Sequence, residues 1–384
     1  MQCGDSRDAI SGTDHSKHLF STIQLISLAM QSGLGPCTLS TLLKEFGTAK
    51  SVLAASTAEL LSIHGVGEKT VKHVREANDL DQAGEVFRWC ERHRINIIPQ
   101  LSPSFPRSLS EMPDAPALLY VQGQLVSEDR LSVAVVGTRH ATPYGITQAS
   151  RFSYGLAKAG ITVVSGLARG IDAAAHRGAL DAGGRTVAVL GSGLAKVYPG
   201  EHAALADELS RSGAVVSEYA PSCPPRCGQF PQRNRLIAGL TLGTLVVEAP
   251  DRSGALITAR LAGELNRDVF ALPGHINSRA SRGCNQLIRD GAILVQSIEE
   301  LIDELGPLSE EISTAEGYSI RNSSELSLNE IETCVLNAIQ PTGNLIDQVI
   351  ANTPYTAQQV LAVISVLEIR RLIRRLSGQY VSRI

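Results

Sequence analysis

The chain has 384 residues, 43% of them hydrophobic and 19% charged, which is ordinary for a globular protein of two or three domains. With a formal net charge of −3 and 4% aromatic residues, it has neither a generally basic surface nor the means for extensive base stacking, so any polyanion site must be local. Its start is polar, no apolar run reaches about 18 residues, and its seven cysteines are scattered, so we expect a cytoplasmic protein without a membrane span.

The first elements in chain order are helical. Residues 1–18 predict a disordered tail, and residues 19–80 predict a helical domain of the SAM or helix-hairpin-helix type. The segment 64–76 carries the clearest signal, because Gly65 and Gly67 allow a hairpin backbone to approach a phosphate just before a helix N-terminus. A tight turn inside a small helical bundle explains the same pattern, so both interpretations stay open.

Residues 81–305 predict the largest domain, an α/β core with an extended Rossmann-like, parallel-rich sheet. Its first part, 81–130, is a connector with one helix and two short strands between prolines. Strand, turn and helix patterns then follow one another seven times, and the strands are near-continuous runs of Val, Ile, Leu and Ala, as in a parallel sheet buried on both faces. We expect these strands at 131–139, 161–170, 186–193, 214–218, 244–249, 268–274 and 292–295.

The composition changes after the core. Residues 306–328 are rich in Ser, Glu, Gly and Thr, which predicts a flexible linker. Residues 329–384 show three helical segments followed by a short strand pair, which is the plan of a winged helix. The third helical segment carries four arginines, for which partner contact or solvation is favoured over base recognition because the preceding helices have few basic residues. These are Arg370, Arg371, Arg374 and Arg375.

The candidate site lies where the predicted strands end, because ligands of open parallel sheets bind outside the carboxyl ends of the strands. Arg139 directly follows the first strand and offers a planar, permanently charged group suited to phosphate; a salt bridge to a loop carboxylate is the alternative. Lys196, after the third strand, is either a phosphate contact or a surface lysine. The other candidates at strand ends are Gly137, Thr138, Ser165, Gly166, Arg169, Gly191, Ser217 and Glu218.

Two expected helix starts add to the capacity for anions, because first-turn amides are unpaired and the helix dipole favours negative charge. Arg233, Asn234 and Arg235 are placed at one of these starts. Ser253 caps the other, with Gly254 directly behind it. Several arginines around one sheet edge predict an extended ligand with more than one phosphate.

The same edge lacks the signatures of catalysis and of cofactor binding. The Gly-Ser-Gly turn at 191–193 has no third glycine, so no dinucleotide cofactor is predicted. Asp172 and His176 share a helix face, but such a pair is more often a cap with a polar contact than an acid–base couple. Cys223 and Cys227 have no second ligand pair, so no metal is predicted either.

Several long motifs, which cover residues 133–295 densely, resemble the DNA-processing protein A family (DprA, also called Smf). They include VAVVGTRHATPYG, VVSGLARGIDAAAHRGAL, TVAVLGSGLAKVYPGEH, GAVVSEYAP, FPQRNRLIAGLTLGTLVVEAPDRSGALITARLAGELNRDVFALPG and SRGCNQLIRDGA. The resemblance implies a cytoplasmic, non-enzymatic protein that binds single-stranded DNA, forms a homodimer, protects incoming DNA during natural transformation and loads the recombinase RecA.

The resemblance also implies roles for individual residues. The family's phosphate-binding arginine corresponds to Arg139 and its serine–glutamate strand end to Ser217 and Glu218. Its FP-x-RNR loop corresponds to Arg233, Asn234 and Arg235. The family's second basic contact is a lysine near a Tyr-Pro turn; in this chain Gly200 follows that turn, and Lys196 comes before it.

Two competing hypotheses remain. A nucleotide hydrolase of the phosphoribohydrolase type has a related fold with a G-T-x-x-E turn, which Gly243-Thr244-Leu-Val-Val-Glu248 partly matches, but the paired glycines that should precede it are absent. A structural partner protein that acts through the winged-helix-like tail is the other alternative.

Overall fold

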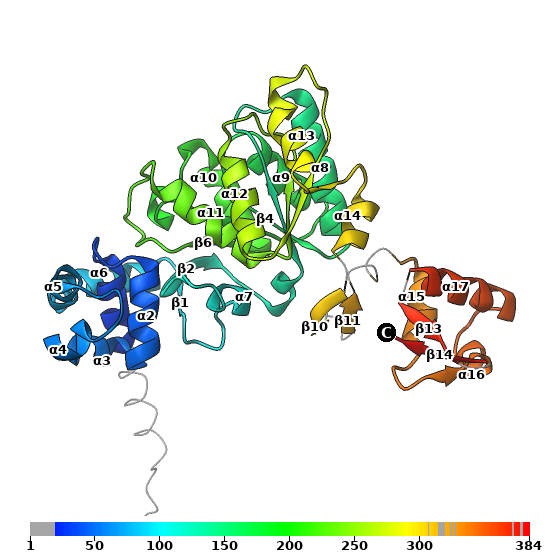
Figure 1. The fold of residues 1–384 in the computed structure, drawn as a ribbon, viewed down its shortest axis with the longest axis horizontal. Helices are drawn as coiled ribbons and strands as arrows, with labels where there is room; N and C mark the ends of the chain where they lie inside the picture. The colour runs from blue at the N-terminus through cyan, green and yellow to red at the C-terminus, as the bar shows by residue number, and fades with distance from the viewer. Residues whose placement is uncertain are drawn as a thin grey trace, which may run out of the picture. The chain divides into compact units, whose positions relative to one another are not determined.

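The structure is a computed structural model that forms two compact units, Met1–Ile293 and Leu294–Ile384 (Figure 1). The tail predicted at 1–18 lies outside the described residues. None of the described helices combines the length and the apolar character needed to cross a bilayer. The described residues are 20–305, 307–313, 319–322, 325, 328–370, 372–376 and 379–384.

The first unit begins with helices, as predicted. A helix at 20–30 is followed by α2 Pro36–Phe46, α3 Ala49–Ala54, α4 Thr57–Leu61, α5 Glu68–Glu76 and α6 Asp81–Arg92. Local sequence sets their starts: the side chain of Thr48 caps α3, and Ser56 forms a capping box at α4. The apolar side chains of these helices and those of the adjacent strands form one buried cluster, so the helical part packs directly on the sheet.

A nine-stranded sheet forms the centre of this unit, with the order β1-β2-β6-β5-β4-β3-β7-β8-β9. Strands β3 to β8 pair in parallel, whereas β1 and β2 are antiparallel additions at one edge. The parallel-rich sheet confirms the predicted fold class. The strands are β1 Asn96–Pro99, β2 Leu118–Gly123, β3 Ser132–Val136, β4 Thr162–Ser165, β5 Thr186–Val189, β6 Ala214–Ser217, β7 Gly243–Val246, β8 Asp268–Ala271 and β9 Ile293–Leu294.

Helices flank this sheet (Figure 1). They cover strands β3 to β7, which are buried along their whole length, and this explains why those strands read as unbroken apolar runs. The helices are α7 Arg107–Ser110, α8 Pro143–Lys158, α9 Ile171–Asp181, α10 Ala203–Ser212, α11 Gln229–Leu240, α12 Gly254–Glu264 and α13 Arg282–Arg289.

The second unit contains a small helical domain with the predicted winged-helix plan. Its apolar residues form a separate core, and its three-stranded sheet has the order β12-β14-β13. The elements are α14 Ile298–Glu304, α15 Glu330–Asn337, β12 Asn344–Leu345, α16 Ile346–Ala351, α17 Ala357–Ile369, β13 Ile373–Arg375 and β14 Tyr380–Arg383.

Two expectations for this unit need correction. The segment predicted as a flexible linker contains two antiparallel strands, β10 Pro307–Ser313 and β11 Ser319–Asn322, because backbone pairing does not require an apolar composition. The third helix, α17, ends before the arginine cluster, and Arg374 and Arg375 lie on β13, where the buried Ile373 directs the chain into the sheet. Arg371 lies outside the described residues.

Candidate functional site

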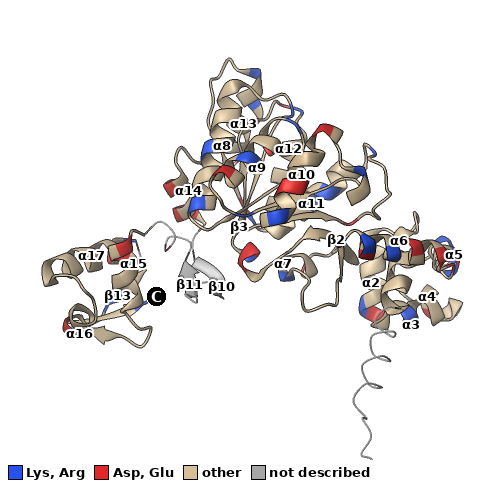
Figure 2. Cartoon of the chain, turned by 180° about the vertical axis from the view of Figure 1, so that it is seen from behind, with Lys and Arg blue, Asp and Glu red and all other residues tan. Residues whose placement is uncertain are grey.

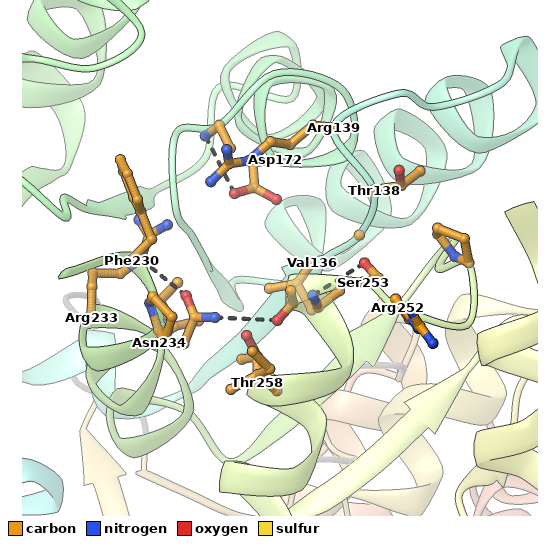
Figure 3. Close-up of a pocket in the computed structure, with 18 of the residues that line it drawn as sticks. Val136, Thr138, Arg139, Asp172, Phe230, Arg233, Asn234, Arg252, Ser253 and Thr258 are labelled. Atoms are coloured by element: carbon orange, nitrogen blue, oxygen red, sulfur yellow. Dashed lines mark hydrogen bonds between the residues drawn. The ribbon is translucent and has the colours of Figure 1, made fainter. Parts of the chain in front are cut away.

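A pocket of about 530 Å³ lies at the carboxyl ends of the parallel strands (Figure 3). Its walls come from the turn after β3 and from the N-terminal ends of α9, α11 and α12. Lysine and arginine are interspersed with acidic residues over the rest of this unit (Figure 2), so the cations of the pocket are a local feature. The predicted site residues that line it are Gly137, Thr138, Arg139, Arg233, Asn234, Ser253 and Gly254.

Arg139 is an exposed cation of this pocket. Its guanidinium carbon lies 5.1 Å from the ring centroid of Phe230, and that ring is in turn 5.5 Å from the ring of Tyr198. No hydrogen bond or carboxylate ion pair holds this guanidinium within the described part of the chain, so the salt bridge considered as its alternative role is not formed. The aromatic contact orients the group and leaves its N–H donors available to a ligand.

The ring of Phe230 depends on a glycine at the end of β5. A Cβ atom at Gly191 would lie 2.8 Å from the ring, closer than carbon atoms can approach. Gly191 therefore contributes to the site by making room for the aromatic residue beneath Arg139, although it is not itself among the lining residues.

The N-terminus of α12 forms another wall. The Oγ of Ser253 accepts a hydrogen bond from the amide of Ala255 at 3.2 Å, and Asn234 donates to the carbonyl of Gly254 at 3.2 Å, which ties α11 to α12. Arg252, directly before the cap, is exposed and lines the same pocket, with no partner for its guanidinium among the described residues (Figure 3). Sequence reasoning missed Arg252, although a cation next to a capped helix start was the available signal.

Arg233 is buried in the pocket wall and satisfies the backbone. Its Nη1 donates to the carbonyl of Gly166 at 2.7 Å and to that of Val189. Burial lowers the pKa of Arg233 to about 10, and the nearby carboxylate of Asp172 opposes this shift. A Cβ at Gly166 would come within 2.5 Å of the guanidinium, so only glycine fits there. Arg233 thus links strand ends instead of projecting toward solvent.

Arg235 lies outside the pocket. Its Nε is 3.3 Å from Asp114, and its Nη2 donates to Glu218, with the side chains of both Arg235 and Glu218 more than nine-tenths buried. Burial raises the pKa of Glu218, and the charge of Arg235 opposes that shift. Behind the same wall, the hydroxyl of Ser217 donates to the carbonyl of Ser192 at 2.7 Å. The contacts of Arg235, Glu218 and Ser217 therefore stabilise the fold beside the pocket.

The prediction that these arginines occupy a helix start is wrong. Helix α11 begins at Gln229, so Arg233 and Arg235 come after its first turn and on its buried side. Phe230 and Pro231 of the first turn line the pocket, together with Arg233 and Asn234.

The remaining predicted residues do not line the pocket. The hydroxyl of Ser165 donates to the carbonyl of Val135 at 2.6 Å inside the core. Arg169 is exposed but forms a two-point ion pair with Glu201, at 2.5 and 2.8 Å. Lys196 is exposed at the end of a short 3-10 helix, Leu194–Lys196, which precedes Tyr198.

Asp172 and His176 do not pair with each other in any described contact. Asp172 accepts a hydrogen bond from the amide of Ala168 at 3.3 Å, and burial raises its pKa against the opposing charge of Arg233. The Nδ1 of His176 is 2.7 Å from the hydroxyl of Thr186. Burial is the main cause that lowers the pKa of His176 to about 3, so this histidine is a neutral core residue at physiological pH.

Glu248 of the G-T-x-x-E turn is also tied to the fold. It is 2% exposed, and its two oxygens accept from the hydroxyl and the amide of Thr142 at 2.6 and 2.9 Å, which anchors the start of α8. Among the described residues, no group of three or more His, Cys, Asp or Glu side chains is placed to share a metal ion.

Replacing Glu248 by alanine is therefore expected to lower the free energy of unfolding by about 1–3 kcal/mol, because two partly buried donors of Thr142 lose a charged acceptor. Urea unfolding followed by circular dichroism measures this effect. Glu264→Ala is the matched control: Glu264 is 60% exposed, pairs with Arg260 at 3.5 Å, and is expected to change stability by less than about 0.5 kcal/mol. Equal stabilities of the two variants would contradict the anchoring role.

Comparison with known proteins agrees with this architecture. Residues 96–306 match the family described as DNA recombination-mediator protein A, residues 24–77 match the SAM-like helix-hairpin-helix tandem, and residues 321–379 match the DprA winged helix domain. The first two matches coincide with the sheet and with the helices packed on it.

Similar proteins carry related names. Protein Smf of Synechocystis sp. is 39% identical over 285 residues, which are 72% of this chain and 70% of that protein. Protein Smf of Escherichia coli is 46% identical over 218 residues, 56% of this chain and 58% of that protein. The X-ray structure of DNA processing protein A from Streptococcus pneumoniae superposes with a TM-score of 0.66 at 36% identity and covers 74% of this chain and 98% of that one. The chain therefore belongs to the DNA recombination-mediator protein A family, as its sequence motifs predicted.

Proposed function

We propose that this protein binds single-stranded DNA at the strand-end pocket and acts as a recombination mediator. The observation that carries the proposal is the pair of exposed guanidinium groups, Arg139 and Arg252, that line one pocket with the capped N-terminus of α12. Phosphate oxygens bind such groups without base recognition. The family match and the names of the similar proteins support the same assignment.

The pocket favours a single strand over a duplex. Phe230 lies beneath Arg139 within the pocket, so an aromatic face and a phosphate-binding group occur side by side. An unpaired nucleotide presents both a base and a phosphate to such an arrangement, whereas a duplex keeps its bases stacked inside. Two cations are also enough for a local site on a chain with a net charge of −3.

The proposal extends to features that the family resemblance implies. We assign the protein a cytoplasmic role in which a homodimer protects incoming single strands and transfers them to RecA, without a chemical step of its own. The carboxylates near the pocket support a non-enzymatic role, because Asp172, Glu218 and Glu248 are all engaged by donors of the protein. We also propose the division into 19–80, 81–305 and 329–384 as the domains of this function.

Fluorescence anisotropy with a labelled single-stranded oligonucleotide and the corresponding duplex tests the proposal at two salt concentrations. The single strand is expected to bind at least about tenfold more tightly, and its affinity should fall with a log–log salt slope of about −0.7 per phosphate contact. Equal affinity for both forms, or an affinity independent of salt, would contradict the proposal.

A further inference from the structure

Trp89, the single tryptophan of the chain, lies in a second hollow of about 450 Å³ beside the strand-end pocket. It belongs to α6 and stacks on His93, with ring centroids 4.0 Å apart and an angle of 18° between the planes. Its side chain is half-buried and borders the hollow, so part of the indole is accessible. The facing wall comes from the core and includes Ala195 and Pro221.

The hollow is bordered by cations from the same helix. Arg88 and Arg92 are both exposed, and no carboxylate partner holds either guanidinium within the described ranges. The Nε of Arg92 donates to the carbonyl of Arg88 at 3.3 Å, which orients its side chain along the helix. Glu85 also lines the hollow, about one turn of α6 before Arg88. The end of the hollow that attracts anions is therefore the one formed by Arg88 and Arg92.

Two chain segments connect this hollow with the strand-end pocket. Ala195 lines the hollow and Tyr198 lines the pocket, and three residues span at most about 11 Å. Lys196, exposed between them, has no carboxylate partner among the described residues. The longer segment from Pro221 to Phe230 begins at the hollow and ends at the strand-end pocket. Both cavities therefore contain arginines and an aromatic ring, and Lys196 lies in the short segment between them.

We propose that the Trp89 hollow is a second contact for the same single strand: one base stacks on Trp89, the neighbouring phosphates bind Arg88 and Arg92, and Lys196 bridges to the strand-end pocket. This assignment rests on the proposed function and deepens it, because it gives the path of the bound DNA over the protein, from the pocket at α11 to the hollow at α6. Stacking on one ring flanked by guanidinium groups is the contact that binds single strands without sequence preference.

Tryptophan emission of the full chain, excited at wavelengths that tyrosine does not absorb, reports on this site alone, since Trp89 is its only tryptophan. Oligothymidylates of about 4 and about 16 nucleotides cover the range of single-strand site sizes. The long oligomer is expected to quench Trp89, whereas the short one, held at Arg139, should leave it unchanged. Trp89→Ala should weaken binding of the long oligomer about 5- to 30-fold in fluorescence anisotropy and leave the short one unaffected.

Two further variants separate contact from folding. Trp89→Phe keeps an aromatic face and should restore most of the affinity, and the double variant Arg88→Ala/Arg92→Ala, at exposed positions, should weaken only the long oligomer. Arg211→Ala removes an exposed arginine of α10 that lines neither cavity, and is the matched charge control.

The inference is overturned if the long oligomer binds the wild type and depends on Arg139, yet neither quenches Trp89 nor loses affinity in the Trp89→Ala and double-arginine variants. Absence of binding to the wild type is a different result, because it overturns the proposed function itself.

Discussion

Replacing Arg139 by alanine is expected to weaken the binding of a single-stranded oligonucleotide about 10- to 100-fold, the range of a hydrogen bond to a charged group. Arg139 forms no ion pair among the described residues, although its charge opposes the rise in the pKa of Asp172 in the same pocket, and its contact with Phe230 already orients it over the pocket. The variant therefore loses a prepared phosphate contact while the fold keeps all its internal ion pairs. Anisotropy titration measures the loss, and the log–log salt slope should become shallower by about 0.7.

A lysine at this position provides a graded control. Arg139→Lys keeps the charge but loses the planar fork above Phe230, so its affinity should lie between those of the wild type and the alanine variant. Arg260→Ala is the matched charge control, because Arg260 is 70% exposed on α12 and outside the lining residues. Wild-type affinity in Arg139→Ala would remove this residue from the site.

Replacing Arg233 by methionine is expected to lower the free energy of unfolding by about 3–5 kcal/mol, the cost of leaving a buried charge without its partner. The change removes a positive charge that favours the ionised form of the buried Asp172, and it leaves the carbonyls of Gly166 and Val189 without their donor. Denaturant unfolding at neutral pH measures the effect. Because Arg233 holds strand ends together, oligonucleotide binding should be lost through the fold and not through a missing phosphate contact.

The loss of unfolding free energy in the Arg233→Met variant should depend on pH. Burial already holds the pKa of Asp172 above its ordinary value of 3.8, and removing the charge of Arg233 raises it further. A carboxyl whose pKa is higher in the folded than in the unfolded state binds more protons when the protein is folded. The free energy of unfolding therefore falls as the pH rises toward that raised pKa. The difference from wild type should therefore be largest at neutral pH and shrink as the pH falls through the raised pKa of Asp172.

A second substitution tests the cause. Asp172→Asn in the Arg233→Met background removes the unpaired charge and should recover part of the lost stability, with a coupling free energy of about 1–3 kcal/mol in the double-mutant cycle. A deficit that does not change with pH and is not relieved by Asp172→Asn would show that packing, and not charge, is the role of Arg233.

The sequence by itself determined the α/β fold class, the strand positions and the location of Arg139. Strands buried on both faces need unbroken apolar runs, and a glycine turn after such a strand places the next side chains at the ligand-binding edge. Those signals are local, so they can be read along the chain. The flanking helical and winged-helix-like plans were predictable for the same reason.

Only the tertiary structure decided which cations are available to a ligand. Arg233 and Arg235 belong to the same motif as the pocket residue Phe230. Both lie on the buried face of α11, where they donate to acceptors from other segments, Gly166 and Glu218. Arg252 had a local signal, the capped helix start that follows it, and was overlooked. Trp89 was missed for a different reason: its hollow forms where separate segments meet, and such a meeting point depends on long-range packing that no local pattern records.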